Sequence, residues 1–382
     1  MTRENMSYSL KLYDDTLLKF NIVDKLDGFK VEVTELDDKK KHLLPPDCNG
    51  DGESLRKWLK HRVIPANRAY VQNFLARTGL NEKDTMGIID VCKGLSLNDC
   101  YWVVDSNFEG KFSDYNLYDN KFSRVLSLIA FTGTGSYTRS TFRSSPEFTT
   151  NGMLAKCWRR EDGKVLLYKS GTEGFANSGL EPYSEFYAYQ IASEMGLSAV
   201  PYNLSKWKGR LCSTCELFTD KDTAFVSAGR LVQEKGIDEL ISFYKKLGEK
   251  FYEDFVDMVV FDALIYNEDR HLGNFGFLID SHSNKILKCA PLFDHGLSLF
   301  CYGMKDDLES IDSYASSRAP ALFNSFDNSV KELITDRQRK QLRSLYNFTF
   351  KKHSRYNWDN YRLKVIEDKI RRRARELSEM GN

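Results

Sequence analysis

Residues 267–274 read NEDRHLGN, and further along residues 293–296 read FDHG. The first stretch places an amide, Asn274, five positions after Asp269, and the second places Asp294 two positions before a glycine. A carboxylate can accept the proton of an attacking hydroxyl, while carboxylate and amide oxygens are ligands for Mg²⁺ that bridges nucleotide phosphates. The two stretches therefore predict a phosphoryl-transfer site using ATP and Mg²⁺, with Asp269 as base and Asn274 and Asp294 as metal ligands.

The composition is that of a globular chain without a dominant charge. Its 382 residues are 41% hydrophobic and 13% aromatic, enough for one large two-lobed domain with an appendage. Lys plus Arg number 55 against 54 Asp plus Glu, so no global basic field recruits nucleic acid or an anionic membrane. The polar N-terminus has no long apolar run, which predicts a cytoplasmic protein without a membrane partner.

The elements around the two stretches follow from periodicity. Apolar positions at helical spacing over 251–266 predict a well-buried helix that leads directly into Asn267, and 275–279 with 285–287 predict a hairpin leading towards Asp294. Near the N-terminus, apolar and polar residues alternate through about residue 45, which predicts a small antiparallel sheet. Ser54 is expected to cap a following helix. Residues 1–125 are therefore expected to form an α+β appendage.

A lysine and a glutamate complete the part of such a site that binds ATP, the phosphate donor. Lys169 shares a strand face with Val165 and Leu167, which lets it reach the α- and β-phosphates. Glu185 falls on the inner face of a helix that ends near Gly196, so it is expected to pair with Lys169 and position ATP. Lys156 and Lys164 remain rival candidates for that lysine, and a surface Lys with a surface Glu is the structural alternative.

The phosphate loop has two candidates. Residues 132–137 are glycine-rich, but 149–153 lie at the first hairpin, before the lysine strand, which fits a kinase better. The segment from Ser145 is expected to open a strand that continues through Ala155. Residues 202–207 and 211–218, divided by Lys208-Gly209, predict a hairpin. Within it, residues 215–218 lie where a strand linking two lobes presents backbone groups to adenine. The expected nucleotide-binding residues are Thr150, Asn151, Gly152, Met153, Lys169, Glu216, Phe218 and His271.

With these motifs, residues from about 130 to about 320 resemble the HipA-like serine/threonine kinases, a bacterial toxin-kinase family. Phosphoinositide kinases share the Asp-Arg-His-x-x-Asn order, which places both in the atypical branch of the kinase fold. The resemblance implies that Asp269 is the catalytic base, that Asn274 and Asp294 bind the metal, and that Lys169 contacts phosphate. It also implies a small DNA-binding antitoxin partner and autophosphorylation near the phosphate loop, where the serines are Ser136, Ser140, Ser144 and Ser145.

Together these observations predict an α+β chain with a two-lobed protein-kinase-like fold. The expected parts are an appendage at 1–125, a β-rich N-lobe at 126–220 and a mostly helical C-lobe at 221–382. The expected activity is transfer of the γ-phosphate of ATP to a serine or threonine of a protein substrate, in a toxin–antitoxin or phage-defence setting. The aspartate precedes Arg-His instead of following it, and no Ala-Pro-Glu element follows Asp294, so a long activation loop of the usual kind is not expected.

Several alternatives remain open at this point. The chain is alternatively a small-molecule or lipid kinase, a nucleotide-binding pseudokinase, or a nucleic-acid-binding repressor with a nucleotide sensor. Basic helices at 53–80 and in the tail from 328 to 377 are compatible with nucleic-acid contact, but solvated helix faces are favoured. The only close cysteine pair, Cys212 and Cys215, is half of a zinc or redox motif at most, and core packing is favoured.

Overall fold

The computed structural model describes residues 6–25, 28–135, 145–232 and 236–380. The chain divides into two compact units. Unit 1 comprises Met1–Tyr168 with the two returning segments Leu217–Val226 and Leu278–Leu287, and unit 2 comprises Lys169–Glu216, Ser227–Phe277 and Lys288–Asn382. The division falls inside the strand that carries Lys169, which is β6 (Lys164–Ser170).

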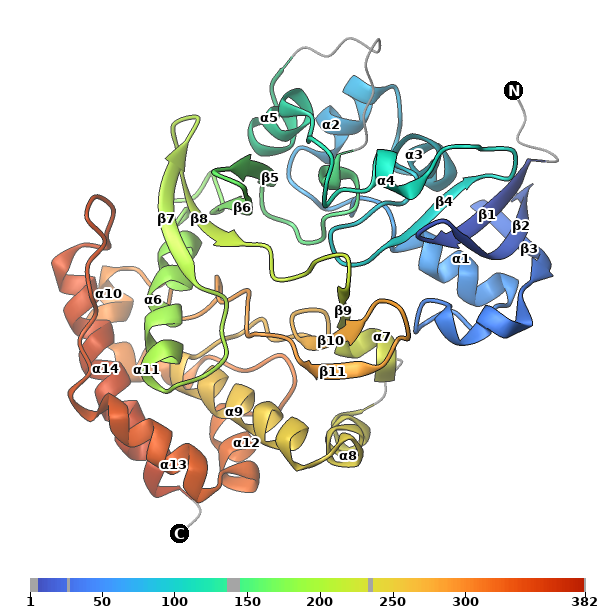
Figure 1. Ribbon diagram of the computed structural model, residues 1–382. Helices are drawn as coiled ribbons and strands as arrows, with labels where there is room; N and C mark the ends of the chain where they lie inside the picture. Colours follow the sequence, from blue (N-terminus) through green and yellow to red (C-terminus); the bar gives the residue numbers. More distant parts are fainter. Residues whose placement is uncertain (1–5, 26–27, 136–144, 233–235, 381–382) are drawn as a thin grey trace. The chain divides into compact units, whose positions relative to one another are not determined.

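A four-stranded sheet forms one part of unit 1 (Figure 1). Its strands are β1 (Ser7–Leu12), β2 (Asp15–Lys25), β3 (Gly28–Leu36) and β4 (Tyr101–Asp105), in the order β3-β2-β1-β4. All three pairings are antiparallel, with β-bulges after Leu10 in β1 and after Lys19 in β2. The alternation of apolar residues exists because one sheet face packs on a core that contains Phe20 and Ile22. The predicted antiparallel sheet is confirmed.

The remaining elements of unit 1 are short. They are η1 (Asp38–Leu43), α1 (Gly52–Lys60), α2 (Val71–Thr78), α3 (Thr85–Cys92), α4 (Phe112–Tyr115), α5 (Arg124–Thr132), η3 (Pro146–Phe148), β5 (Lys156–Glu161) and β9 (Thr223–Ser227). Helix α1 contacts β3 and begins earlier than expected. Asp51, rather than Ser54, is its N-cap, because the Asp51 carboxylate accepts the N–H groups of Glu53 and Ser54. The predicted cap was wrong.

The strand expected from Ser145 to Ala155 was also wrong. Pro146–Phe148 is a 3₁₀ turn, and β5 begins only at Lys156. The cause is Glu147, whose buried carboxylate accepts the hydroxyl hydrogens of Ser145 and Ser127 and the Trp158 N–H. These hydrogen bonds turn the backbone out of an extended path.

Two arginines in the basic stretch 53–80 are structural. Arg62 makes a buried ion pair with Asp99 at 2.5 Å and lies over the Trp58 ring. Arg68 is buried and donates to the carbonyl oxygens of Thr150 and Lys156. These two cations therefore stabilise unit 1 internally and are not offered to a nucleic acid, which weakens the nucleic-acid alternative for this stretch.

In unit 2, a hairpin and a helix lie behind the candidate site. Strands β7 (Tyr202–Trp207) and β8 (Arg210–Glu216) pair in antiparallel register from Tyr202 opposite Cys215 to Trp207 opposite Arg210. Helix α6 (Glu181–Glu194) contacts both strands and has Pro182 in its first turn. The hairpin and the helix predicted for these residues are confirmed.

The rest of unit 2 is mostly helical (Figure 1). Its helices are α7 (Ala228–Val232), α8 (Ile237–Leu247), α9 (Glu249–Ile265), α10 (Lys305–Glu309), α11 (Ile311–Ser316), α12 (Phe326–Leu333), α13 (Asp336–Arg343), η4 (Ser344–Asn347) and α14 (Asn360–Glu379). Strands β10 (Gly276–Asp280) and β11 (Ile286–Cys289) each belong partly to unit 1 and partly to unit 2. Helix α9 is buried on every side from Phe255 to Ile265, because α8, α12, α13 and α14 all contact it. The predicted well-buried helix is confirmed.

No helix within the described residues has both the length and the apolar character needed to cross a membrane. The stretches 267–274 and 293–296, with Asp269 and Asp294, both lie in unit 2.

Candidate functional site

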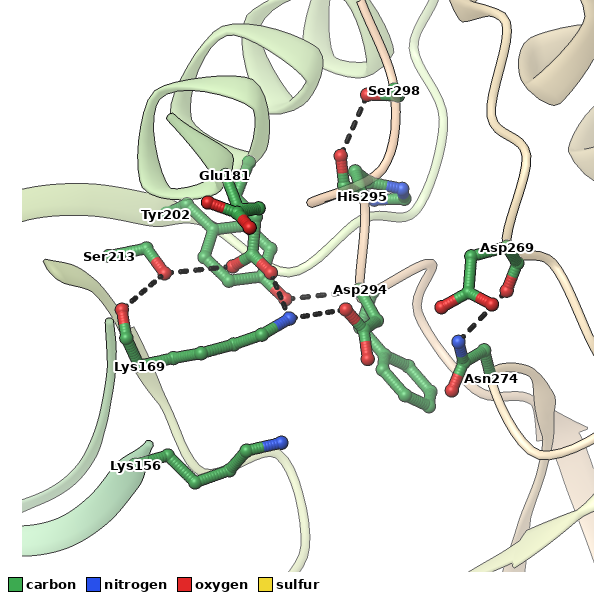
Figure 2. Close-up of polar contacts among 12 residues, drawn as sticks. Lys156, Lys169, Glu181, Tyr202, Ser213, Asp269, Asn274, Asp294, His295 and Ser298 are labelled. Atoms are coloured by element: carbon green, nitrogen blue, oxygen red, sulfur yellow. Dashed lines mark hydrogen bonds and ion pairs between the residues drawn. The ribbon is translucent and has the colours of Figure 1, made fainter. Parts of the chain in front are cut away.

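Lys169 and Glu185 form a buried ion pair in unit 2. The Lys169 Nζ lies 2.5 Å from Glu185 Oε1, and Glu185 is fully buried at 0% exposure. Lys169 is the penultimate residue of strand β6, and Glu185 lies in the second turn of helix α6. Lys169 also pairs with Asp294, which Figure 2 shows at the end of the extended lysine side chain. One ammonium group therefore joins a strand, a helix and the FDHG segment.

The charges of this cluster do not balance. Burial lowers the pKa of Lys169, but Asp294 and Glu185 outweigh that effect and raise it above its ordinary value. Burial raises the pKa of Glu185, and Lys169 opposes this rise. Ser213 on β8 donates a hydrogen bond of 3.0 Å to the second carboxylate oxygen of Glu185. The lysine stays charged between two carboxylates, and the cluster has a surplus of negative charge.

The loop after α9 presents Asp269 and Asn274. Tyr266 ends the helix in a left-handed conformation with φ 52°, which turns the chain sharply. The Asp269 N–H then donates to Asn267 Oδ1 at 3.2 Å, and Asn274 Nδ2 donates to the Asp269 carbonyl at 3.0 Å. Because the Asn274 nitrogen is engaged with the loop backbone, its amide oxygen is the atom available to a cation.

Asp269 carries a perturbed carboxylate. Burial raises its pKa, His271 lowers it, and Asp294 raises it further. The negative charge of Asp294 thus adds to the effect of burial on the pKa of Asp269. In Figure 2, Asp269 and Asn274 face the pair formed by Lys169 and Asp294. A carboxylate with a raised pKa, next to a second carboxylate, is typical of a group that exchanges protons in a reaction.

Arg270 braces the loops that hold these residues. Its guanidinium binds both carboxylate oxygens of Asp262 on α9, at 2.8 and 3.0 Å. It also donates to the carbonyls of Asn274 and Phe293, at 2.8 and 2.7 Å, and contacts His295 Nδ1 at 3.0 Å. One planar cation thus connects the loop that ends at Asn274 with the segment from Phe293 to His295. Sequence reasoning missed the role of Arg270 and Asp262, although an aspartate inside the apolar stretch of α9 was a usable signal.

His295, which follows Asp294, is fully buried and neutral. Burial lowers its pKa well below the ordinary value, and Arg270 lowers it further. The Phe261 ring meets the imidazole edge to face at 5.3 Å. The adjacent Ser298 hydroxyl donates to the His295 carbonyl at 2.7 Å. This histidine therefore supports the FDHG segment and accepts from Arg270, rather than exchanging protons.

Asn274 and Asp294 supply hard oxygen ligands of the kind that Mg²⁺ binds. Among the residues that the structure describes, no group of three or more His, Cys, Asp or Glu side chains is arranged to hold a metal ion. Mg²⁺ bound with a nucleotide needs only one or two protein ligands, because phosphates and waters complete its octahedron. The surplus negative charge around Lys169 also favours a bound cation. The residues present therefore fit Mg²⁺ bound as a nucleotide complex.

The expected phosphate-loop residues, Thr150–Met153, lie in unit 1, as does Phe218. Gly152 has φ 92°, and a Cβ at this position would lie 2.2 Å from Lys156 Nζ. That ammonium donates to the Asn151 carbonyl at 2.8 Å. The loop is thus ordered around Lys156, and only glycine fits at residue 152.

The other expected nucleotide contacts lie in unit 2. Glu216 is exposed at the end of β8. His271 is exposed, and its Nδ1 accepts the Gly273 N–H at 3.0 Å. Their contacts with a nucleotide stay predictions.

The serines expected to be autophosphorylated divide into two groups. Ser136, Ser140 and Ser144 lie outside the described residues. Ser145 is fully buried, and its hydroxyl donates to Glu147. A buried and hydrogen-bonded hydroxyl is a poor acceptor for a kinase, so Ser145 is the weakest candidate of the four.

Cys212 and Cys215 point to opposite faces of β8, as residues three apart in a strand must. Cys212 Sγ contacts the Ser205 carbonyl at 3.4 Å, and both cysteines are buried thiols. Two side chains on opposite faces cannot ligate one ion, so core packing is the better interpretation of this pair.

A sequence profile for the HipA-like C-terminal domain matches residues 147–353, more than half of the chain. The serine/threonine-protein kinase CtkA of Helicobacter pylori (strain J99) is 32% identical over 140 residues, which are 33% of this chain and 42% of CtkA. The match thus spans less than half the length of that relative.

Two solved structures are also similar. The Shewanella oneidensis MR-1 HipA from a complex with HipB and operator DNA is 11% identical with a TM-score of 0.55, over 97% of both chains. The H. pylori proinflammatory kinase CtkA gives 17% identity and a TM-score of 0.46, over 59% of this chain and 92% of that one. The first likeness shows a shared mixed α+β fold over nearly the full length. Because the profile covers the residues that build the site, the chain belongs to the family of proteins with a HipA-like C-terminal domain.

Proposed function

We propose that this chain is a serine/threonine protein kinase that transfers the γ-phosphate of Mg²⁺-ATP to a hydroxyl of a protein substrate. The observation that carries the proposal is the buried Lys169–Glu185 pair joined to Asp294, with Asp269 and Asn274 facing it. Phosphoryl transfer depends on positioning and charge stabilisation more than on covalent chemistry with the protein. Membership of the HipA-like family and the similarity to CtkA, which is named a serine/threonine kinase, support the same activity.

In the proposed reaction each residue has one role. Lys169 contacts the α- and β-phosphates, and Glu185 fixes the direction of the lysine. Asn274 and Asp294 hold Mg²⁺, which neutralises charge on the phosphates when it is bound. The acceptor hydroxyl oxygen forms a bond with the γ-phosphorus, the bond from that phosphorus to the ADP oxygen breaks, and the hydroxyl proton passes to Asp269. The products are ADP and a phosphoprotein.

The proposed division of labour follows the kinase fold. A β-rich N-lobe at 126–220 supplies the phosphate loop and Lys169, and a helical C-lobe at 221–382 supplies Asp269 and the metal ligands. Residues 1–125 are an appendage. The returning segments of unit 1, 217–226 and 278–287, contribute to the same compact unit as the appendage.

The experiment for the activity is transfer of labelled γ-phosphate by the full chain, followed by intact mass and by labelling of a cell lysate. Wild type should label itself or a protein, and Asp269→Asn and Asp294→Asn should not. Asp336→Asn is the matched control, because it makes the same chemical change at a fully exposed carboxylate. A wild type that binds ATP yet labels no protein would reject protein kinase activity and leave a small-molecule kinase or a nucleotide-binding module.

The setting of the activity is proposed from the HipA–HipB–DNA complex of S. oneidensis. We propose that the chain binds a small DNA-binding antitoxin partner and acts in a toxin–antitoxin or phage-defence system. Purification of the tagged full chain from its native cells, followed by mass spectrometry, should recover such a partner. Recovery of the chain alone would contradict this part of the proposal and leave the kinase assay unaffected.

Autophosphorylation is proposed for the segment before the phosphate loop. Incubation with Mg²⁺-ATP should place phosphate on Ser136, Ser140 or Ser144 rather than on the buried Ser145. Phosphopeptide mapping that finds no phosphate between residues 132 and 150 would exclude this form of regulation.

A further inference from the structure

Asp294 has a backbone conformation that is uncommon outside glycine, although aspartate tolerates it better than most residues do. Its φ is 58°, in the left-handed region. The direction of its carboxylate, which pairs with Lys169, depends on this conformation. A residue in such a conformation persists only where its neighbours hold it there, and such residues gather at functional sites. The structure must therefore contain groups that fix the Asp294 backbone.

The first of these groups lie in the segment before β7. The Leu292 N–H donates to the Ser198 carbonyl, and the Val200 N–H donates to the Leu292 carbonyl, each at 2.8 Å. Ala199 and Leu292 form an isolated parallel bridge. This short ladder runs alongside the chain that enters the FDHG segment, and it stops at Leu292, two residues before Asp294.

Tyr202 continues the contact where the ladder ends. Its hydroxyl accepts a hydrogen bond of 3.1 Å from the Asp294 N–H, as the dashed line between these residues in Figure 2 shows. Tyr202 is only 8% exposed. Burial raises its pKa well above the ordinary value, so the hydroxyl stays neutral and remains a hydrogen-bond partner at any physiological pH.

The tyrosine is itself fixed by β8. Cys215 lies directly opposite Tyr202 in the antiparallel β7–β8 register, so the two side chains are cross-strand neighbours on one face of the hairpin. Cys215 and Ser213 share one face of β8, because residues two apart in a strand point the same way. Ser213 donates to Glu185 from that face. One strand face therefore supports the partner of Lys169 and the tyrosine that reaches Asp294.

We propose that Tyr202 is a positioning residue that holds Asp294 in its metal-binding conformation through the Asp294 N–H. The inference rests on the proposed function for the role of Asp294 as a metal ligand. It adds that the metal affinity of the site depends on a hydroxyl that touches neither metal nor nucleotide. Partners behind a metal ligand commonly affect metal affinity by about 10–100-fold.

The test compares two tyrosine-to-phenylalanine substitutions in the full chain. Tyr202→Phe removes the hydroxyl proposed to act on Asp294. Tyr187→Phe is the matched control, because Tyr187 is also buried in unit 2 and its hydroxyl makes one hydrogen bond of 2.8 Å, to Asn357. Each variant is titrated with Mn²⁺ in the presence of a non-hydrolysable ATP analogue, and free Mn²⁺ is measured by electron paramagnetic resonance. Tyr202→Phe should raise the Mn²⁺ dissociation constant about tenfold, whereas Tyr187→Phe should leave it unchanged.

A kinetic measurement separates positioning from general damage. The Mg²⁺ concentration for half-maximal phosphate transfer should rise in Tyr202→Phe by a factor similar to that for Mn²⁺ binding, with a smaller loss of kcat at saturating Mg²⁺. Cys215→Ala should shift both values in the same direction by less. The inference is overturned if Tyr202→Phe binds Mn²⁺ as tightly as wild type does, or if Tyr187→Phe loses as much Mn²⁺ affinity as Tyr202→Phe. It is also overturned if wild type does not bind Mn²⁺. A wild type that binds Mn²⁺ but transfers no phosphate would reject the kinase proposal alone, since the binding comparison still decides the role of Tyr202.

Discussion

Unit 2 contains two buried ionic clusters that differ in how completely their charges are balanced. Arg270 and Asp262 form a closed pair, in which a guanidinium meets one carboxylate and the Asn274 and Phe293 carbonyls. Lys169 meets two carboxylates, and one of them, on Asp294, keeps 29% of its side chain exposed. The closed pair fixes loops, whereas the open cluster sets two carboxylates against one ammonium, the arrangement proposed here to bind a cation. Two ion pairs can thus be equally buried and yet differ in net charge: Arg270 meets one carboxylate, whereas Lys169 meets two. We expect the balanced pair to matter for stability and the unbalanced cluster to matter for activity.

The largest expected effect comes from the carboxylate that faces the open cluster, Asp269. Asp269→Asn should lower kcat for phosphate transfer by about 10²–10⁴-fold, because the acceptor hydroxyl loses its base. Steady-state kinetics with Mg²⁺-ATP measure the change, and circular dichroism should show an unaltered fold. Asp336→Asn is the exposed control. Full activity of Asp269→Asn would assign the proton to another group.

Breaking the closed pair should affect stability instead. Arg270→Leu leaves the Asp262 carboxylate buried without its cation, which typically costs about 3–5 kcal/mol in the free energy of unfolding. Urea unfolding measures this loss. The double variant Arg270→Leu with Asp262→Leu should recover part of it, because the uncompensated charge is gone. A double variant less stable than Arg270→Leu would mean that Asp262 has other essential partners.

A smaller effect is expected from the hydroxyl that supports the open cluster. Ser213→Ala removes a hydrogen bond to the buried Glu185 carboxylate and should lower the free energy of unfolding by about 1–3 kcal/mol. Ser184→Ala is the matched control, since this buried hydroxyl donates to the Ser298 carbonyl at 3.0 Å. Ser213→Ala should also raise KM for ATP, while Ser184→Ala should not. Identical KM values in the two variants would remove Glu185 from nucleotide positioning.

The smallest expected effect is a pH dependence. Burial raises the pKa of Asp269, and transfer requires its unprotonated form, so activity should fall as the pH drops through that raised pKa. A carboxyl whose pKa is raised in the folded state favours folding while it is protonated, and this contribution is lost as the pH rises through the folded pKa.

Asp269→Asn should therefore gain thermal stability relative to wild type at neutral pH and lose that advantage in acid. Melting temperatures of the two proteins across the pH range check this. A constant difference at every pH would contradict the direction of the shift.

The sequence allowed prediction where the signal was local. The sheet at the N-terminus, the β7–β8 hairpin and the buried helix before Asn267 were predicted because periodicity reports one buried face at a time. Lys169 and Glu185 were expected to pair because strand and helix faces fix the directions of their side chains, and the structure places them in contact. Family membership was predicted from the two short motifs and the placement of Lys169 and Glu185, and it is confirmed.

Long-range hydrogen bonds could not be anticipated in the same way. The Arg270–Asp262 pair and the contact of Tyr202 with Asp294 join residues whose proximity depends on the folded loops. The strand expected after Ser145 failed because one buried carboxylate, Glu147, binds groups from three different segments. The roles of Asp269, Asn274 and Asp294 stay predictions until a nucleotide is bound.

We propose above all that Asn274 and Asp294 hold Mg²⁺ bound to ATP in front of Lys169. A crystal structure of the full chain with Mn²⁺ and a non-hydrolysable ATP analogue tests it, because anomalous scattering locates Mn²⁺ independently of the protein phases. We expect an anomalous Mn²⁺ peak about 2.1 Å from the Asn274 amide oxygen and the Asp294 carboxylate, with phosphate oxygens as further ligands. Lys169 should contact the α- and β-phosphates of the same nucleotide. A nucleotide bound elsewhere, or a metal peak that contacts neither residue, would contradict the account.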